Sequence, residues 1–229
     1  RFGRAVEYQG AYYVGGEMQA LPRELGSVAE AMYHLCRGPM LGTIAGHVDE
    51  REVLQAVFLG AGAELSSLMV TPRLWAWAGG RDFHAWPAAD LALWSSTILV
   101  LDHGTDIFVW EGLEVALNPE LQASGQAVVG DLLRRLVAGR FPAPTVRNFK
   151  EASSQSRFML SRLIPMHKDA PEVQEAHFPP LSGLEPQARE SLRARLPRTD
   201  EPSYFDWLGS LQTRPPERDP SEAIQCLSL

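Results

Sequence analysis

Arg157 lies in the segment of the chain whose residue types and spacing are best suited to chemistry. The segment covers residues 145–166 and combines a short β-type run, a polar turn and a helical pattern that begins near Ser153. The apolar side of this predicted helix consists of Phe158, Met159, Leu160, Leu163 and Ile164. Small hydroxyl residues, Ser153 and Ser161, flank Arg157 on another side. The pattern leaves open whether Arg157 is a solvated surface charge or a group presented to a partner, and it favours the surface charge.

Other residues that could perform chemistry do not form a recognised catalytic or metal-binding pattern. The histidines are scattered, at positions 34, 47, 84, 103, 167 and 177, without an HExxH pair or a Cys/His cluster. No phosphate-binding loop of the GxxxxGK or GxGxxG type and no GxSxG nucleophile motif is present. Asp102 and His103 fall in a predicted hairpin turn, where turn geometry explains both. The carboxylate pairs at 49–50 and 200–201 lie at predicted helix starts, where they complement the helix dipole.

The composition indicates a folded chain that does not bind nucleic acid broadly. Of the 229 residues, 45% are hydrophobic, and the net charge is −7. No run approaches the roughly 18 apolar residues of a membrane span. Two cysteines, Cys36 and Cys226, favour a reducing, cytosolic setting, and Cys36 is expected to be a small buried residue on a helix. Since residue 1 is Arg and no signal-peptide pattern follows, we interpret the chain as a piece of a longer protein.

The first part of the chain is predicted to be mostly helical. Residues 1–24 have no clean period and are expected to be irregular or the remnant of a helix. Ser27 and Glu30 form a capping-box pattern at the start of the next helix. A further helix is predicted from Val48–Asp49, followed by a short one over Glu64–Val70 that Pro72 stops.

The middle of the chain is predicted to contain strands, followed by helices. Strand patterns occur at Arg73–Ala78, Asp82–Trp86, Ser96–Asp102, Asp106–Trp110 and Thr145–Phe149. The third and fourth of these form a hairpin across a turn that contains glycine. Asn118–Pro119 is a strong helix start, and further helices are predicted from Pro186 and near residues 202–212.

Three blocks of the sequence together resemble one protein family. Residues 99–115, LVLDHGTDIFVWEGLEV, with the long helix after them, are similar to a gelsolin-type repeat. The block from about Phe2 to Pro72 is similar to the helical domain that precedes a gelsolin-like domain in the inner-shell subunits of the COPII vesicle coat. Residues 153–162, SSQSRFMLSR, resemble the signature of the GTPase-activating subunit of that shell. The final helix, near residues 199–211, also resembles the C-terminal helix of that subunit.

This resemblance implies a role for Arg157 as an arginine finger. In such a mechanism a guanidinium inserted in trans stabilises the negative charge that develops on phosphate oxygens during GTP hydrolysis. The chain would then be a GTPase activator, rather than an enzyme in its own right, for a Sar-type small GTPase in transport from the endoplasmic reticulum to the Golgi. Implied partners are the cargo-binding sister subunit and the outer-coat subunits, without nucleic acid. The implied location is cytoplasmic, peripheral on endoplasmic reticulum membrane, at exit sites and on COPII vesicles.

The same resemblance predicts the fold class and the domain organisation. The fold is expected to be α+β, with an all-helical segment followed by a gelsolin-like domain in which helices flank a mixed β-sheet. The helical part is expected over residues 1–72 and the gelsolin-like domain over residues 73–213, with a long connection at 167–198. Residues 214–229 are predicted to be a disordered tail. No cofactor is implied in this region, and a structural zinc is expected only in a part upstream of residue 1.

Departures from the family pattern keep other interpretations open. Ser153–Ser154 replaces the glycine pair of the family, which predicts a stiffer turn, and the connection at 167–198 is longer than in the family. The zinc finger, β-sandwich and trunk of the family are not in the chain, so weak binding to the GTPase is expected. Alternatives are a catalytically silent paralogue, a non-catalytic coat or adaptor subunit, and the cargo-binding sister subunit. An actin- or calcium-binding gelsolin repeat is a further interpretation, which the helical block in front disfavours.

Overall fold

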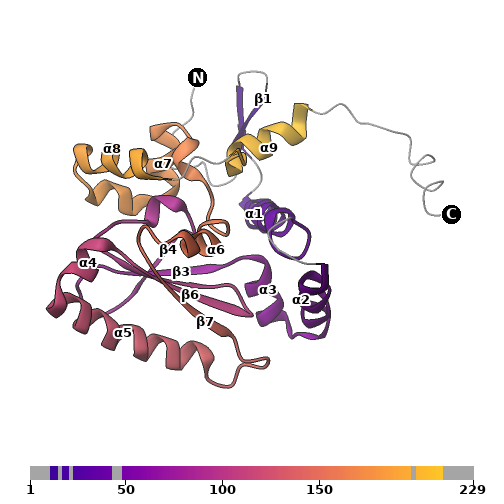
Figure 1. Ribbon diagram of the computed structural model, residues 1–229. Helices are drawn as coiled ribbons and strands as arrows, with labels where there is room; N and C mark the ends of the chain where they lie inside the picture. Colours follow the sequence, from indigo (N-terminus) through magenta and orange to yellow (C-terminus); the bar gives the residue numbers. More distant parts are fainter. Residues whose placement is uncertain (1–10, 15–16, 21–22, 43–47, 197–199, 214–229) are drawn as a thin grey trace.

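A five-stranded mixed sheet lies at the centre of the molecule, with helices on both of its faces (Figure 1). The computed structural model describes residues 11–14, 17–20, 23–42, 48–196 and 200–213. The strands are β3 (Arg73–Trp77), β4 (His84–Trp86), β5 (Ile98–Asp102), β6 (Asp106–Glu111) and β7 (Thr145–Lys150). Their order is β4-β3-β5-β6-β7, with antiparallel pairs except for the parallel pair β6–β7. This arrangement confirms the predicted α+β class.

The hairpin of β5 and β6 forms the buried centre of the sheet. All five residues of β5 are buried, and successive side chains point to opposite faces. Ile98 and Val100 therefore join one hydrophobic cluster, whereas Leu99 and Leu101 join another on the opposite face. Gly104 makes the turn possible, because its φ of +78° is unfavourable for other residues and a Cβ there would lie 2.5 Å from Met69 Cγ. The hairpin was predicted correctly from its sequence.

The long helix α5 (Pro119–Val137) covers one face of the sheet, after the short helix α4 (Leu113–Leu117). As predicted, Asn118 caps α5, and its side chain accepts a hydrogen bond from Leu121 N at 3.2 Å. Gly125 lets the helix approach the sheet closely, since a Cβ at this position would lie 2.4 Å from Ile98 Cδ1. The crossover through α5 gives β7 its parallel direction beside β6.

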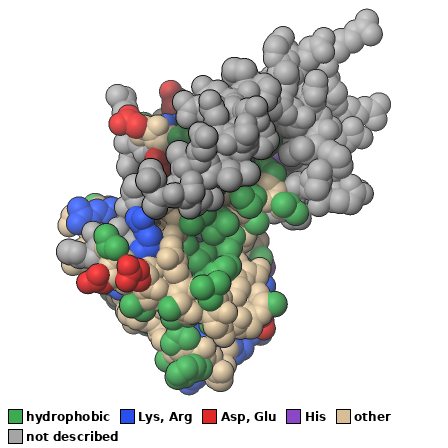
Figure 2. All heavy atoms as spheres, turned by 90° about the vertical axis from the view of Figure 1, so that its right-hand side faces the viewer, with side chains coloured by type: hydrophobic (Ala, Val, Ile, Leu, Met, Phe, Trp, Pro, Cys, Tyr) green, Lys and Arg blue, Asp and Glu red, His purple; other side chains and the backbone are tan. Residues whose placement is uncertain are grey.

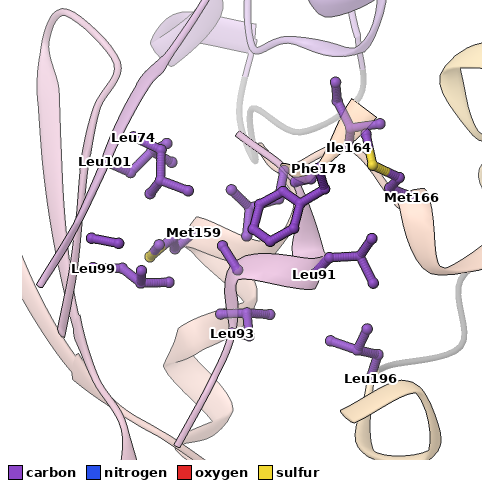
Figure 3. Close-up of a cluster of buried hydrophobic side chains, with 14 of the residues drawn as sticks. Leu74, Leu91, Leu93, Leu99, Leu101, Met159, Ile164, Met166, Phe178 and Leu196 are labelled. Atoms are coloured by element: carbon purple, nitrogen blue, oxygen red, sulfur yellow. The ribbon is translucent and has the colours of Figure 1, made fainter. Parts of the chain in front are cut away.

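The other face of the sheet carries the larger hydrophobic core (Figure 3). Four 3₁₀ segments lie in this part of the chain: η2 (Asp90–Ala92), η3 (Ser154–Ser156), η4 (Met166–Lys168) and η5 (Pro179–Gly183). The helices α6 (Arg157–Leu160), α7 (Pro171–His177) and α8 (Pro186–Arg195) also lie on this side. Phe178 and Leu181 are fully buried, and Leu192 is 2% exposed. The segment predicted as a long connection, 167–198, thus supplies core residues over the part that is described.

The N-terminal elements differ in part from the prediction. A hairpin of β1 (Ala11–Val14) and β2 (Glu17–Ala20) replaces the expected irregular or helical start. The block before Pro72 is therefore not all helical, because two tyrosines and a valine directly before a pair of glycines favour a strand and a tight turn. The helices that follow are α1 (Arg23–Arg37), α2 (Val48–Gly60) and α3 (Ala63–Val70). The helices α2 and α3 begin near their predicted positions, whereas α1 begins at Arg23, so Ser27 lies inside the helix and the predicted capping box at its start is wrong. Cys36 was predicted to be buried and is exposed, because it lies on the outer side of α1.

The last described helix, α9 (Tyr204–Thr213), packs against α1. The rings of Tyr33 and Tyr204 are 5.5 Å apart between centroids in an edge-to-face arrangement, and Trp207 lies 5.4 Å from Tyr33. Tyr33 also donates a hydrogen bond to the Pro202 carbonyl at 2.8 Å. The amphipathic pattern near residues 202–212 therefore predicted a docked helix correctly, whereas the predicted tail at 214–229 lies outside the described residues.

Within the described part, no helix has the length and apolar character that crossing a membrane requires.

Candidate functional site

Arg157 is exposed at the first position of helix α6, directly after the 3₁₀ turn η3. Its guanidinium carbon lies 5.5 Å from the centroid of the Phe158 ring, which is itself 42% exposed. Among the described residues, Arg157 has no hydrogen bond or ion pair through its guanidinium. The donors of this side chain are therefore free to contact an acceptor outside the described chain. Arg157 forms no internal ion pair in the described part of the chain.

The helix around Arg157 is much shorter than its sequence pattern predicted. It has only four residues, and Ser153 lies before it, where its hydroxyl accepts a hydrogen bond from Gln155 N at 3.3 Å. Ser153 is therefore not on one helical face with Arg157 and Ser161. The chain leaves the helical path because Ile164 precedes a proline and pairs with another segment. Ile164 N donates to Ala88 O at 2.8 Å.

The predicted apolar residues of this helix are nevertheless mostly buried. Met159 is fully buried, and Leu163 and Ile164 are 1% and 4% exposed. Figure 3 shows Met159 beside Leu99 and Leu101 of the central strand β5. Burial of Met159 holds the short helix against the sheet, while the neighbouring Arg157 points away from the core. Phe158 was placed on the apolar side by the prediction and is instead half-exposed.

Residues 151–163, which follow strand β7 and contain Arg157, are called the Arg157 turn below. Glu151 anchors the start of this turn. Its carboxylate accepts hydrogen bonds from Leu113 N at 2.7 Å and from the Ser95 hydroxyl at 2.9 Å. It also pairs with Arg195 of α8 at 2.7 Å. A second contact closes the turn on itself, since the Ser156 hydroxyl donates to the Lys150 carbonyl at 3.0 Å. Three distant segments thus meet at the residue where the turn begins.

Two arginines fasten the other end of the turn. Arg37 of α1 donates to the Leu163 carbonyl at 3.2 Å and forms an ion pair with Glu201. Arg162 donates to the Phe158 carbonyl and, through Nε, to His103 Nδ1 at 3.2 Å. The turn is therefore fixed at both ends by charged side chains, which contribute stronger hydrogen bonds than neutral groups do.

The histidines near the turn are neutral at neutral pH. Burial lowers the pKa of His103 to about 3, with a further lowering by the charge of Arg162. Burial and the charge of Arg37 lower the pKa of His34 to about 4. Burial also lowers the pKa of Arg162 to about 10, which leaves it cationic at pH 7. The neutral imidazole of His103 can therefore accept the hydrogen bond that Arg162 donates.

Asp102 has the turn role that the sequence predicted, together with an ion pair that was not anticipated. Its carboxylate accepts a hydrogen bond from Gly104 N at 3.0 Å and pairs with Arg140 at 2.7 Å. Arg140 directly follows Gly139, just after the end of α5. This position is the signal in the sequence that could have suggested the ion pair between Arg140 and Asp102. Among the described residues, no group of three or more His, Cys, Asp or Glu side chains could hold a metal ion.

Comparison with known proteins relates the chain to coat subunits. No family model matches the sequence. Protein transport protein SEC23 A of Arabidopsis thaliana is 43% identical over 201 residues, which are 88% of this chain and 23% of that protein. The GTPase-activating protein NEL1 of Saccharomyces cerevisiae is 29% identical over 136 residues, which are 58% of this chain and 21% of NEL1.

The solved structure of the human COPII-coat protein Sec24c has a similar fold. Its TM-score is 0.52 with 15% identity, over 62% of this chain and 23% of that one. Fold and sequence together identify the chain as a relative of the COPII inner-coat subunits. Its sequence is similar to SEC23 A, of which it spans less than a quarter. The resemblance inferred from the sequence blocks is confirmed.

Proposed function

We propose that this chain is part of a GTPase activator of the COPII inner coat and that Arg157 is its arginine finger. The observation that carries the proposal is the exposed guanidinium, free of internal partners in the described chain, on a turn fastened at both ends. A planar guanidinium can donate two hydrogen bonds to phosphate oxygens, and it stabilises the charge that develops there during hydrolysis. The similarity to NEL1, a GTPase-activating protein, supports the same role.

The partners and location follow from the same proposal. The GTPase would be of the Sar type, and the other partners would be the cargo-binding sister subunit and the outer-coat subunits. The protein would act in the cytoplasm, in peripheral association with endoplasmic reticulum membrane at exit sites and on COPII vesicles. We also propose a division at residue 72, between a first part in which the β1–β2 hairpin precedes the helices α1–α3 and a gelsolin-like domain over residues 73–213. Since the chain spans 23% of SEC23 A, most of the surface that binds the GTPase would lie elsewhere in the full-length protein.

A non-catalytic coat subunit is the second candidate function. It is supported by the fold, which is similar to that of Sec24c. In this case the exposed surface around Arg157 would serve only protein contacts. The two candidates differ in one measurable property, which is the dependence of GTP hydrolysis on the Arg157 side chain.

Arg157→Ala in the full-length protein tests the catalytic role. Single-turnover GTP hydrolysis by the small GTPase is measured on liposomes at increasing concentrations of the wild-type or variant protein. We expect the stimulated rate at saturation to fall by about 10³, the lower end of the effect of arginine fingers. Arg157→Lys should also lose most of the stimulation, because an ammonium group lacks the planar pair of donors.

Arg81→Ala is the matched control for these variants. Arg81 is an exposed arginine in the turn between β3 and β4, away from the Arg157 turn, and its removal changes the net charge by the same amount. It should stimulate hydrolysis as the wild-type protein does. Full stimulation by Arg157→Ala would contradict the arginine-finger role and favour the non-catalytic coat subunit.

A further inference from the structure

Arg162 is a half-buried cation at the far end of the Arg157 turn. Its guanidinium carbon lies 4.7 Å from the centroid of the Phe108 ring, on the face of the sheet that α6 covers. One edge of the guanidinium donates to His103 Nδ1 at 3.2 Å, and a terminal nitrogen donates to the Phe158 carbonyl. The ring stacking and the two hydrogen bonds fix both the plane and the direction of the group.

The acceptor of the second hydrogen bond belongs to the residue next to Arg157. Phe158 is the second residue of α6, a helix of only four residues. So short a helix has almost no stability of its own, and its last carbonyl groups lack partners within the helix. A cation that binds one of these carbonyls holds the helical turn closed. It also complements the negative end of the helix dipole.

We propose that Arg162 is a positioning residue for Arg157 and that His103 and Phe108 hold Arg162 in place for this task. The inference rests on the proposed function of Arg157. Arg162 does not contact the GTPase in this scheme. It keeps α6 folded, so that the exposed guanidinium of Arg157 is presented in one position. Because the turn is already ordered, binding of the GTPase carries no further entropic cost for ordering it.

The arrangement needs an arginine at position 162. A lysine could donate to His103 or to the Phe158 carbonyl, but its single ammonium group cannot reach both in the present geometry and lie flat over Phe108. The neighbouring charges on this group are Asp106, which favours the cation, and Arg147, which opposes it. His103 must present an unprotonated Nδ1, and its burial maintains this state at neutral pH.

The proposal is tested with Arg162→Lys in the full-length protein. Hydrolysis by the small GTPase is measured as above, with the saturating rate and the half-saturating concentration fitted separately. We expect the saturating rate to fall by about 10-fold or more, because a displacement near 1 Å costs up to about 10². The half-saturating concentration should be unchanged, since the binding surface is intact. If Arg162 only stabilised the fold, the substitution would lower the amount of folded protein and would not lower the saturating rate at an unchanged half-saturating concentration.

Arg193→Lys is the matched control for the loss of an arginine. Arg193 of α8 is half-buried and donates two hydrogen bonds to Gln174 Oε1, at 2.9 and 2.6 Å, away from the Arg157 turn. It should leave both the saturating rate and the half-saturating concentration unchanged.

His103 supplies a second pair of variants in case Arg162→Lys folds poorly. His103→Asn keeps an acceptor near the position of Nδ1 and should retain the rate, whereas His103→Leu removes the acceptor and should lower it.

Amide hydrogen exchange of residues 157–161 adds a measurement that does not depend on the GTPase. Exchange should be faster in Arg162→Lys than in the wild type or in Arg193→Lys. The proposal is overturned if Arg157→Ala lowers the saturating rate while Arg162→Lys and His103→Leu leave it unchanged. Loss of stimulation in none of the variants, Arg157→Ala included, would instead overturn the proposed function.

Discussion

His34 and His103 are buried in uncharged form, and this makes the stability of the fold dependent on pH. The folded-state pKa values are about 4 and about 3, below the unfolded value near 6.5. The unfolded chain therefore binds more protons between these values, and stability falls as the pH drops below 6.5. Each histidine should lower the free energy of unfolding by about 2 kcal/mol between pH 7.5 and pH 5.

Asp169 acts in the opposite direction over the same range. Burial raises its pKa to about 6 from 3.8, so the folded state binds the extra proton and gains stability as the pH falls below 6. Urea unfolding of the chain at pH 7.5 and pH 5 should therefore show a net loss of about 2–3 kcal/mol on acidification. The loss should shrink in His103→Gln and grow in Asp169→Asn. An equal loss in all three proteins would contradict this assignment.

At the scale of elements, α5 contains two glycines with different surroundings. A Cβ at Gly125 would lie 2.4 Å from Ile98 and 2.8 Å from Trp77, whereas nothing lies within 4 Å of a Cβ at Gly130. Alanine favours a helix over glycine by about 1 kcal/mol, so Gly130→Ala should raise the free energy of unfolding by up to that amount. Gly125→Ala should lower it by about 1–3 kcal/mol because the helix must move off the sheet.

Thermal unfolding of the two variants measures this difference directly. Each variant is the control for the other, because the helix and the substitution are the same. Stabilisation by both substitutions would show that α5 does not need the close approach at Gly125. The sequence alone cannot distinguish the two glycines, since both interrupt one helical pattern and the contact of Gly125 with Ile98 of β5 is not visible in it.

Elements with strong local signals were predictable from the sequence, and those set by distant contacts were not. The β5–β6 hairpin and the capped start of α5 have turn and cap residues that specify them locally. The length of α6 is instead set by the bridge between Ile164 and Ala89, which no local pattern reveals. The candidate site divides in the same way. The exposure of Arg157 followed from its helical pattern, whereas the contacts of Glu151 and Arg162 join segments 38 to 59 residues apart.

At the scale of the whole molecule, α2 is packed very loosely. None of its residues is buried, and Val53 and Leu59 are 63% and 84% exposed. Figure 2, which faces the side that carries α1–α3, shows hydrophobic side chains exposed on that side. Contiguous apolar surface of this kind favours association of the isolated chain.

Val53→Lys combined with Leu59→Lys should remove part of this apolar surface at little cost to the fold. The free energy of unfolding should change by less than about 0.5 kcal/mol, as for other surface substitutions. Fluorescence of a hydrophobic dye bound to the chain, and its self-association in sedimentation, should both decrease. Met159→Ala is the contrast, because Met159 is fully buried, and it should cost about 2–5 kcal/mol. A comparable loss in the double variant would mean that α2 is not an exposed element.

The fastening of the Arg157 turn also has a consequence for the synthesis of the protein. Its anchors include Arg37, which is 126 residues from Leu163, and Arg195, which is 44 residues beyond Glu151. A chain that leaves the ribosome at about 5–20 residues per second completes these contacts only after α8 has emerged. Contacts between such distant residues also form late in folding, because long loops must close first. An unfinished or truncated chain would therefore lack the contacts that fix the position of Arg157.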